Sequence, residues 1–361
     1  MNRQRIVYEP DSVSPPGATL HQIMIQRSLN VTDLAARLDL TRKHLTDILK
    51  GAAPITPETA LKLERVLQTP ARFWNNREQQ YRDFLARKAE EDILQSQLEW
   101  LKNFKPFLNK MVEYGWIPPS SDPVERLRNL LNFFGVASPD VWEREWGELP
   151  AYFRKSQKLD ADRYALAAWM RHGERVARTR ACKSYDRRKF LSVLREVREL
   201  SRKPARVFQP QLESLCAECG VAVIFVPELP KTASGATRWL SPDRALLQLS
   251  LRYKTDDHLW FTFFHEAAHI LLHQKKAIFV ESKSYHTREE NEADEFAATT
   301  LIPKRNFKTL IAKGVPTLAE VCRFADSLKI APGIVVGQLQ NRGIYAYNRG
   351  NRLKRTLKWK S

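Results

Sequence analysis

The stretch FTFFHEAAHILLH, residues 261–273, decides the fold of the C-terminal part of the chain. Its apolar flanks predict a buried helix that begins after residues 256–257. On such a helix His265 and His269 project from one face, one turn apart, so a single tetrahedral Zn²⁺ can bind both imidazoles. Glu266 stands beside the first of them, where a carboxylate can accept a proton from metal-bound water and deliver it to a leaving amine. The alternative is a helix with two unrelated histidines, because so short a pattern also recurs by chance.

Strands are predicted before this helix and a second helix after it. Residues 221–226 (VAVIFV) are dense in β-branched and aromatic side chains, which is typical of a buried strand, and residues 245–251 indicate another strand. Residues 288–298 (REENEADEFAA) predict a helix rich in carboxylates. From the pattern alone, this helix either carries a metal ligand or is a plain acidic helix end.

The residue pattern also leaves the third metal ligand open. His273 lies one more turn along the face of the two histidines, too far to share the metal, and is expected to cap the helix or bind backbone. On the acidic helix Glu289 and Glu292 share a face with Phe296, whereas Glu290 falls elsewhere with Glu295. Candidates for stabilising a transition state are Tyr285, His286 and Arg288.

The segment HEAAHILLH, followed by NEADEFAATTLIP, resembles the ImmA/IrrE family of metallopeptidases over about residues 205–305. The resemblance implies a zinc-dependent peptidase with Glu292 as the third ligand. It places Asp294 behind the ligands, where a carboxylate orients a ligating histidine and raises its basicity. The chain departs from many members at Ala267 and Ala268, positions that bear no ligand.

The N-terminal part, residues 18–87, has the pattern of short amphipathic helices with tight joints. After a helix that ends near Leu38, Thr41 is a suitable N-cap for a helix through Leu49. Two short helices with so small a joint indicate a helix-turn-helix, whose second helix enters the major groove of DNA. Its outward side chains include Arg42, Lys43, Thr46 and Lys50, with Arg42 and Lys43 as the predicted base readers. The alternative is a small helical bundle for protein contacts only.

The run TDLAARLDLTRKHLTDILKGAAPITPETALKLERVLQTPARFWNNREQQYR resembles the Xre/Cro-type domains of HigA-like antitoxins. The resemblance covers roughly residues 17–85. It implies binding of a double-stranded DNA operator, usually as a homodimer, and often regulation of the protein's own operon.

Composition agrees with a folded, polyanion-binding protein. The 361 residues carry a formal charge of +18 and are 43% hydrophobic. No run of 18 apolar residues and no apolar stretch behind the N-terminus is present, so we expect no membrane span, no secretory signal and a cytoplasmic protein. A basic segment at 171–206 either extends a DNA footprint or holds an acidic partner, and the tail at 349–360 reads as a loose cationic patch.

The sequence therefore predicts a mainly α protein with a small α+β part, in three regions. These are a helix-turn-helix domain of the lambda-repressor-like type (1–88), a helical linker or middle region whose tryptophans fill a core (89–205), and a zincin-like metallopeptidase domain with a small sheet, C-terminal helices and basic tail (206–361). Residues 321–339 echo the N-terminal motif, but Ala331-Pro332-Gly333 replaces the polar start of a recognition helix, so packing is favoured there. The predicted function is a DNA-binding regulator with zinc-dependent endopeptidase activity towards a repressor or partner protein. The alternative is a HigA-like antitoxin and autorepressor of a toxin–antitoxin operon, with the peptidase fold as an inactive scaffold or metal sensor.

Overall fold

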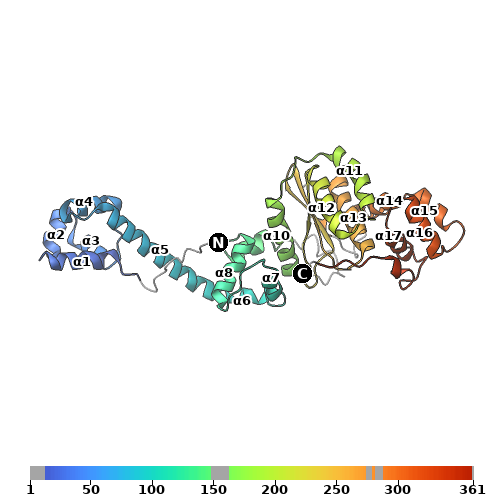
Figure 1. The fold of residues 1–361 in the computed structure, drawn as a ribbon. Helices are drawn as coiled ribbons and strands as arrows, with labels where there is room; N and C mark the ends of the chain where they lie inside the picture. The colour runs from blue at the N-terminus through green and yellow to red at the C-terminus, as the bar shows by residue number, and fades with distance from the viewer. Residues whose placement is uncertain (1–12, 148–161, 274–278, 281–287, 360–361) are drawn as a thin grey trace. The chain divides into compact units, whose positions relative to one another are not determined.

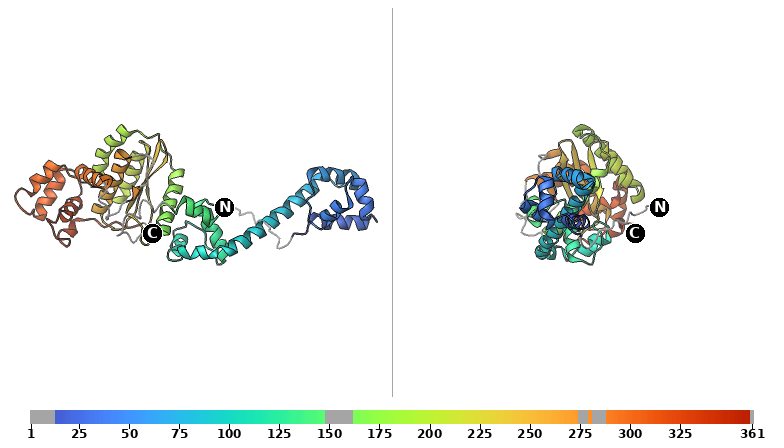
Figure 2. Two further views of the ribbon diagram at one scale, coloured as in Figure 1. Left: turned by 180° about the vertical axis from the view of Figure 1, so that it is seen from behind. Right: turned by 90° about the vertical axis from the view of Figure 1, so that its left-hand side faces the viewer.

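The computed structural model of the chain describes residues 13–147, 162–273, 279–280 and 288–359. The chain forms two compact units, Met1–Leu98 and Glu99–Ser361, each of which is described by itself (Figures 1 and 2). Among the described residues, no helix is both long and apolar enough to cross a membrane.

The first unit is helical throughout its described part. Its helices are α1 (Pro16–Gln26), α2 (Val31–Leu38), α3 (Arg42–Leu49), α4 (Pro57–Leu67) and α5 (Ala71–Ser96). Local signals set their ends, since the side chains of Asn30, Thr41 and Thr56 each accept a hydrogen bond from a backbone N–H in the first turn of the following helix. The joint between α2 and α3 is short because Asp39 ends α2 in the left-handed conformation. The predicted helix-turn-helix is confirmed.

The second unit begins with helices around an aromatic core. They are α6 (Leu98–Leu101), η1 (Lys102–Phe104), α7 (Leu108–Glu113), α8 (Pro123–Phe134), α9 (Pro139–Glu145) and α10 (Arg163–Thr179). Phe104, Phe134, Trp142 and Trp169 are buried together in this core. The prediction that the tryptophans of this region fill a core is confirmed for Trp142 and Trp169, both fully buried.

A small mixed sheet follows helices α11 (Arg187–Leu200) and α12 (Ala205–Ala217). Its strands are β1 (Val221–Phe225), β2 (Gly235–Ser241), β3 (Arg244–Leu249) and β4 (Phe279–Val280), in the order β1-β3-β2-β4. Strand β1 runs parallel to β3, and β2 pairs antiparallel with both β3 and β4. Both faces are buried, as the nearly continuous apolar run of β1 requires.

The two faces of the sheet belong to different cores. Ala222, Ile224 and Leu246 face the aromatic core, whereas Val223 and Leu247 face the core that contains α13. Helix α10 packs on the first face, where the Trp169 indole N–H donates to the carbonyl of Val226 at 3.2 Å. The predicted middle region and the sheet thus share one compact unit, and the structure shows no separation near residue 205.

Helix α13 (Asp256–Leu272) lies at the centre of the other core and is covered by α14 (Arg288–Leu301) and α17 (Pro332–Asn341). Helices α15 (Lys304–Ile311) and α16 (Leu318–Ser327) complete this end of the chain, with the short η3 (Asn351–Leu353). Helix α17 buries most of its length, including Val335 and Leu339, so the part of the chain that echoes the N-terminal motif packs against α13 as predicted.

The prediction of a loose cationic tail is wrong for its described residues. Lys354 forms an ion pair with the buried Asp257 at 2.7 Å, and Arg355 forms one with the buried Asp256 at 3.0 Å. Thr356 bridges to Thr255 at the start of α13. Lys354 and Arg355 therefore neutralise two buried acids at the N-terminal end of the central helix.

Candidate metal centre and DNA-reading helix

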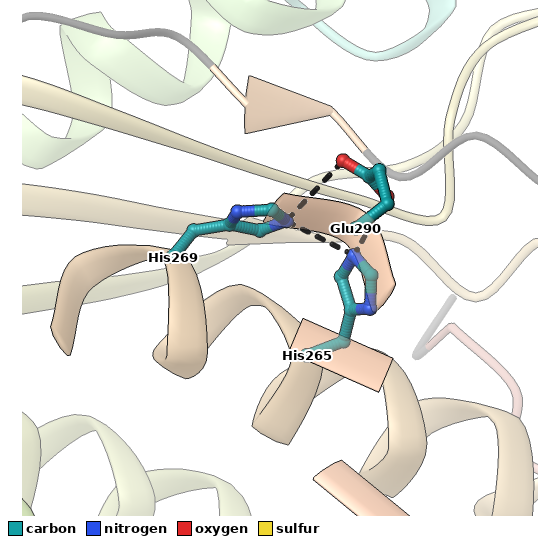
Figure 3. A group of neighbouring side chains, drawn as sticks. All are labelled: His265, His269 and Glu290. Atoms are coloured by element: carbon teal, nitrogen blue, oxygen red, sulfur yellow. Dashed lines mark hydrogen bonds and ion pairs between the residues drawn. The ribbon is translucent and has the colours of Figure 1, made fainter. Parts of the chain in front are cut away.

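His265 and His269 lie side by side on α13, as their spacing of four residues requires (Figure 3). Their Nε2 atoms are 3.1 Å apart, and both rings are buried. Two imidazole nitrogens that face one point in a buried site are arranged as a metal ion would need them.

Glu290 of α14 completes the group. Its Oε2 lies 3.3 Å from His265 Nε2 and its Oε1 lies 3.5 Å from His269 Nε2 (Figure 3). One ligand atom from each of the three residues falls within 4.8 Å of the others, which makes this, within the described ranges, the only such group of three able to hold a metal ion. The cluster supplies two nitrogen donors and one carboxylate.

Glu292, which the resemblance implied as the third ligand, is placed elsewhere. Its carboxylate accepts a hydrogen bond from Arg288 Nε at 2.7 Å and faces His273 Nε2 at 3.4 Å. Side chains two residues apart on a helix point in widely different directions, so Glu290 and Glu292 cannot both reach the pair of histidines. The structure brings Glu290, and not Glu292, to the candidate metal centre.

Asp294 stands behind His265, where the resemblance placed it. Its Oδ1 lies 2.8 Å from His265 Nδ1, on the side of the ring away from Glu290. A hydrogen bond there keeps the proton on Nδ1 and leaves Nε2 as the lone-pair donor. Asp294 follows Glu290 by four residues, so one face of α14 supplies both the candidate ligand and the partner of a histidine.

Glu266 is fully buried and is held by the sheet. The hydroxyl of Thr237 on β2 lies 2.6 Å from Glu266 Oε2, and a Cβ added at Gly235 would meet Glu266 Cγ at 2.8 Å. Neither residue was predicted from the sequence. A glycine inside a strand is a signal of close backbone approach, and Thr237 follows it on the same face of β2.

Burial also determines the charge of the central histidine. Burial, together with the neighbouring His265 and His273, lowers the pKa of His269 to about 2. The ring is therefore neutral at physiological pH and keeps the lone pair that a metal ligand needs.

Helix α3 presents a basic surface in the first unit. Leu45 and Ile48 are buried, whereas Arg42, Lys43 and Lys50 are exposed. The side chain of Thr46 is half-buried, and its hydroxyl donates to the carbonyl of Arg42 at 2.8 Å. The four predicted DNA contacts therefore lie on α3 and its C-cap residue Lys50, and three of them are exposed cations.

Two family models match the chain. One, described as helix-turn-helix, matches residues 20–74, and the other, a peptidase family described as the IrrE N-terminal-like domain, matches residues 216–336. The chain joins a helix-turn-helix domain to an IrrE N-terminal-like domain. The second match includes the three residues of the candidate metal centre, and the first includes α3.

Solved structures similar to the chain cover less than a quarter of it. The antitoxin HigA of Pseudomonas aeruginosa with the higBA promoter is 25% identical, with a TM-score of 0.21 over 22% of this chain and 86% of that chain. An addiction module antidote protein of a HigA family from Coxiella burnetii is 28% identical, with a TM-score of 0.21 over 23% of this chain and 91% of that chain. The search of curated proteins found no match.

The remaining predicted residues of the IrrE-like domain have less defined places. Tyr285 and His286, two candidates for stabilising a transition state, lie outside the described residues. Arg288, the third candidate, is paired with Glu292 on α14. Cys216 and Cys219 are buried in the core that contains α13.

Proposed function

We propose that this protein is a DNA-binding regulator whose IrrE-like domain is a zinc-dependent endopeptidase that cleaves a repressor or partner protein. The observation that carries the proposal is the convergence of His265, His269 and Glu290, with the buried carboxylate of Glu266 on the same helix. Two imidazoles and one carboxylate are a donor set of catalytic zinc sites, which keep a fourth position for water.

His265, His269 and Glu290 would hold the zinc ion, which lowers the pKa of bound water to about 7 and polarises a peptide carbonyl. The carboxylate of Glu266 takes the proton of the attacking water and delivers it to the leaving amine. Thr237 donates to one oxygen of that carboxylate and fixes its position, so the other oxygen is the proton acceptor. Asp294 holds the tautomer of His265 that leaves Nε2 to bind metal.

The helix-turn-helix domain determines which DNA sequence the protein binds. We infer that α3 enters the major groove of an operator, with Arg42 and Lys43 at base edges and Thr46 and Lys50 towards phosphates. A homodimer that reads two half-sites is the arrangement that helix-turn-helix proteins commonly use.

The purified full-length chain provides the test. We expect one zinc ion per chain by elemental analysis, and cleavage of a mixture of synthetic peptides read by mass spectrometry. Glu266→Gln should retain the metal and lose about 10²–10⁴-fold in cleavage rate, because it removes only the proton acceptor. Glu289→Gln, an exposed change on α14, is the matched control and should alter neither.

Absence of stoichiometric metal from the wild type would rule out the enzyme. If Glu266→Gln binds metal and still represses and derepresses its operator as wild type does, proteolysis is not the regulatory output. The metal-sensing autorepressor is then the correct function. Footprinting of the operator with and without a chelator would show the change in affinity that such a sensor requires.

A further inference from the structure

His273 occupies the end of the helix that carries the candidate ligands. Its backbone is extended, it is the C-cap residue of α13, and its N–H donates to the carbonyl of His269 at 3.2 Å. The side chain turns back under the helix and is only 5% exposed. The Nδ1 atom lies 2.8 Å from His269 Nδ1.

The direction of the hydrogen bond between the two rings follows from their surroundings. An N···N contact at this distance needs one proton, carried by one of the two atoms. His269 directs Nε2 towards His265 and Glu290, so a metal-binding Nε2 leaves the proton on Nδ1. His273 Nδ1 must then be the acceptor, and the proton of the His273 ring stands on Nε2.

The atoms beyond His273 suit this tautomer. Its Nε2 faces the carboxylate of Glu292 at 3.4 Å, and Arg288 donates to that carboxylate at 2.7 Å. A carboxylate accepts and never donates when ionised, so it favours a protonated Nε2 on His273. Donation therefore runs from His269 to His273 and from His273 to Glu292, and Arg288 donates to the same carboxylate from its other side.

We propose that His273 is the positioning residue of the second metal ligand, with Glu292 and Arg288 fixing its orientation; this rests on the metal site proposed above. It serves His269 as Asp294 serves His265, so each histidine ligand has an acceptor at its Nδ1 atom. The proposal also gives a role to Glu292, which belongs to the support of the site and not to its ligands.

The experiment measures metal affinity of the full-length chain, independently of cleavage. The affinity for Zn²⁺ is obtained by competition with a chromophoric chelator, and the geometry of the site is followed by the visible absorption of Co²⁺. His273→Leu keeps a buried side chain but removes the acceptor, and we expect about 10–100-fold weaker Zn²⁺ binding with an altered Co²⁺ spectrum. His273→Asn, whose amide oxygen can occupy the place of Nδ1, should recover most of the affinity.

Two further variants separate this proposal from the metal site itself. Glu290→Gln should weaken Zn²⁺ binding far more than Glu292→Gln, because only the first removes a ligand. Wild-type affinity and spectrum in His273→Leu, or equal losses in His273→Leu and His273→Asn, would overturn the positioning role. If Glu290→Gln and His269→Ala also bind Zn²⁺ as wild type does, the proposed function fails with it.

Glu292→Gln also covers the case in which His273→Leu does not fold. It leaves His273 in place and changes only the group behind it. A several-fold loss of Zn²⁺ affinity supports the proposal, and wild-type affinity in this variant, with Glu290→Gln impaired, overturns it.

Discussion

Replacement of Arg355 by methionine tests whether the tail stabilises α13, the helix that carries the two candidate histidine ligands. Asp256, the first residue of α13, is 1% exposed, and Arg355 Nε donates to its Oδ2 at 3.0 Å. The guanidinium also donates to backbone carbonyls after α11, those of Ser201, Arg202 and Lys203. In Arg355→Met the carboxylate would stay buried without its cation.

The expected cost is large. Removing one partner of a buried ion pair costs about 3–5 kcal/mol, and the side chain of Arg355 is 40% exposed, which reduces the value. The backbone N–H of Arg355 still donates to Asp256 Oδ1 in the variant. We therefore expect a loss of about 2–3 kcal/mol in the free energy of unfolding, which is below that range.

Urea unfolding of the full-length chain, followed by tryptophan fluorescence, measures this loss in the transition of the Glu99–Ser361 unit. Arg352→Met, at a nearby exposed position, is the control and should stay within about 0.5 kcal/mol of wild type. Adding Asp256→Asn to Arg355→Met should restore part of the loss, because it removes the uncompensated charge. Equal stability of the two arginine variants, with no coupling to Asp256, would refute the reasoning.

The pH dependence of the same loss has a definite sign. Burial raises the pKa of Asp256 above its ordinary 3.8, although the backbone and guanidinium of Arg355 oppose the shift. Without the guanidinium the folded-state pKa rises further, so the folded chain binds more protons than the unfolded one above pH 3.8. The stability of Arg355→Met should therefore fall as pH rises from about 4 through that raised pKa, and its deficit should shrink in acid.

Three further outcomes are expected. Burial, aided by Arg175, lowers the pKa of His172 from 6.5 to about 4. The unfolded chain therefore binds this proton at a higher pH than the folded chain does, and up to about 3 kcal/mol of the free energy of unfolding is lost as pH falls from 6.5 to 4. His172→Phe keeps the ring stack on Trp116 and should make the urea midpoint nearly independent of pH over this range. Arg42→Ala should cost about 1–3 kcal/mol of operator binding and relax specificity at one base position, and an equal loss on every DNA in a gel-shift series would mean a phosphate contact. Thr237→Val should slow peptide cleavage about 10-fold with metal content unchanged, because it removes one hydrogen bond, worth about 1.4 kcal/mol, that positions the Glu266 carboxylate, whereas Thr237→Ser should behave as wild type.

Local signals made much of the fold predictable. The caps at Thr41 and Thr56 are both formed, and the reciprocal capping box of Thr317 and Glu320 opens α16. Each of these interactions joins residues no more than three apart, so its chemistry is visible in a short window of sequence. The pair of histidines on α13 was predictable for the same reason, since a helix brings residues four apart together.

Partners distant in the chain were not predictable in this way. Thr237 reaches Glu266 across 29 residues, and Arg355 reaches Asp256 across 99. The sequence predicted a loose tail because residues 349–361 contain no aspartate or glutamate with which their basic side chains could pair. Its partners are two acids at the start of a buried helix, and their need for cations follows from burial, which is a property of the folded chain.

The phase of α14 explains why Glu290, and not Glu292, lies beside His265 and His269. Ala293, Ala297 and Leu301 are its buried side chains, and they define the stripe that faces the core. At about 100° per residue, Glu290 lies roughly 20° from the centre of that stripe and Glu292 roughly 140° from it. The resemblance matches residues by their place in the motif and not by the side of the helix that they occupy, and it therefore implied Glu292. Three small or apolar residues at helical spacing carry the better information, because the side of α14 that packs on α13 is the side from which Glu290 reaches both His265 and His269.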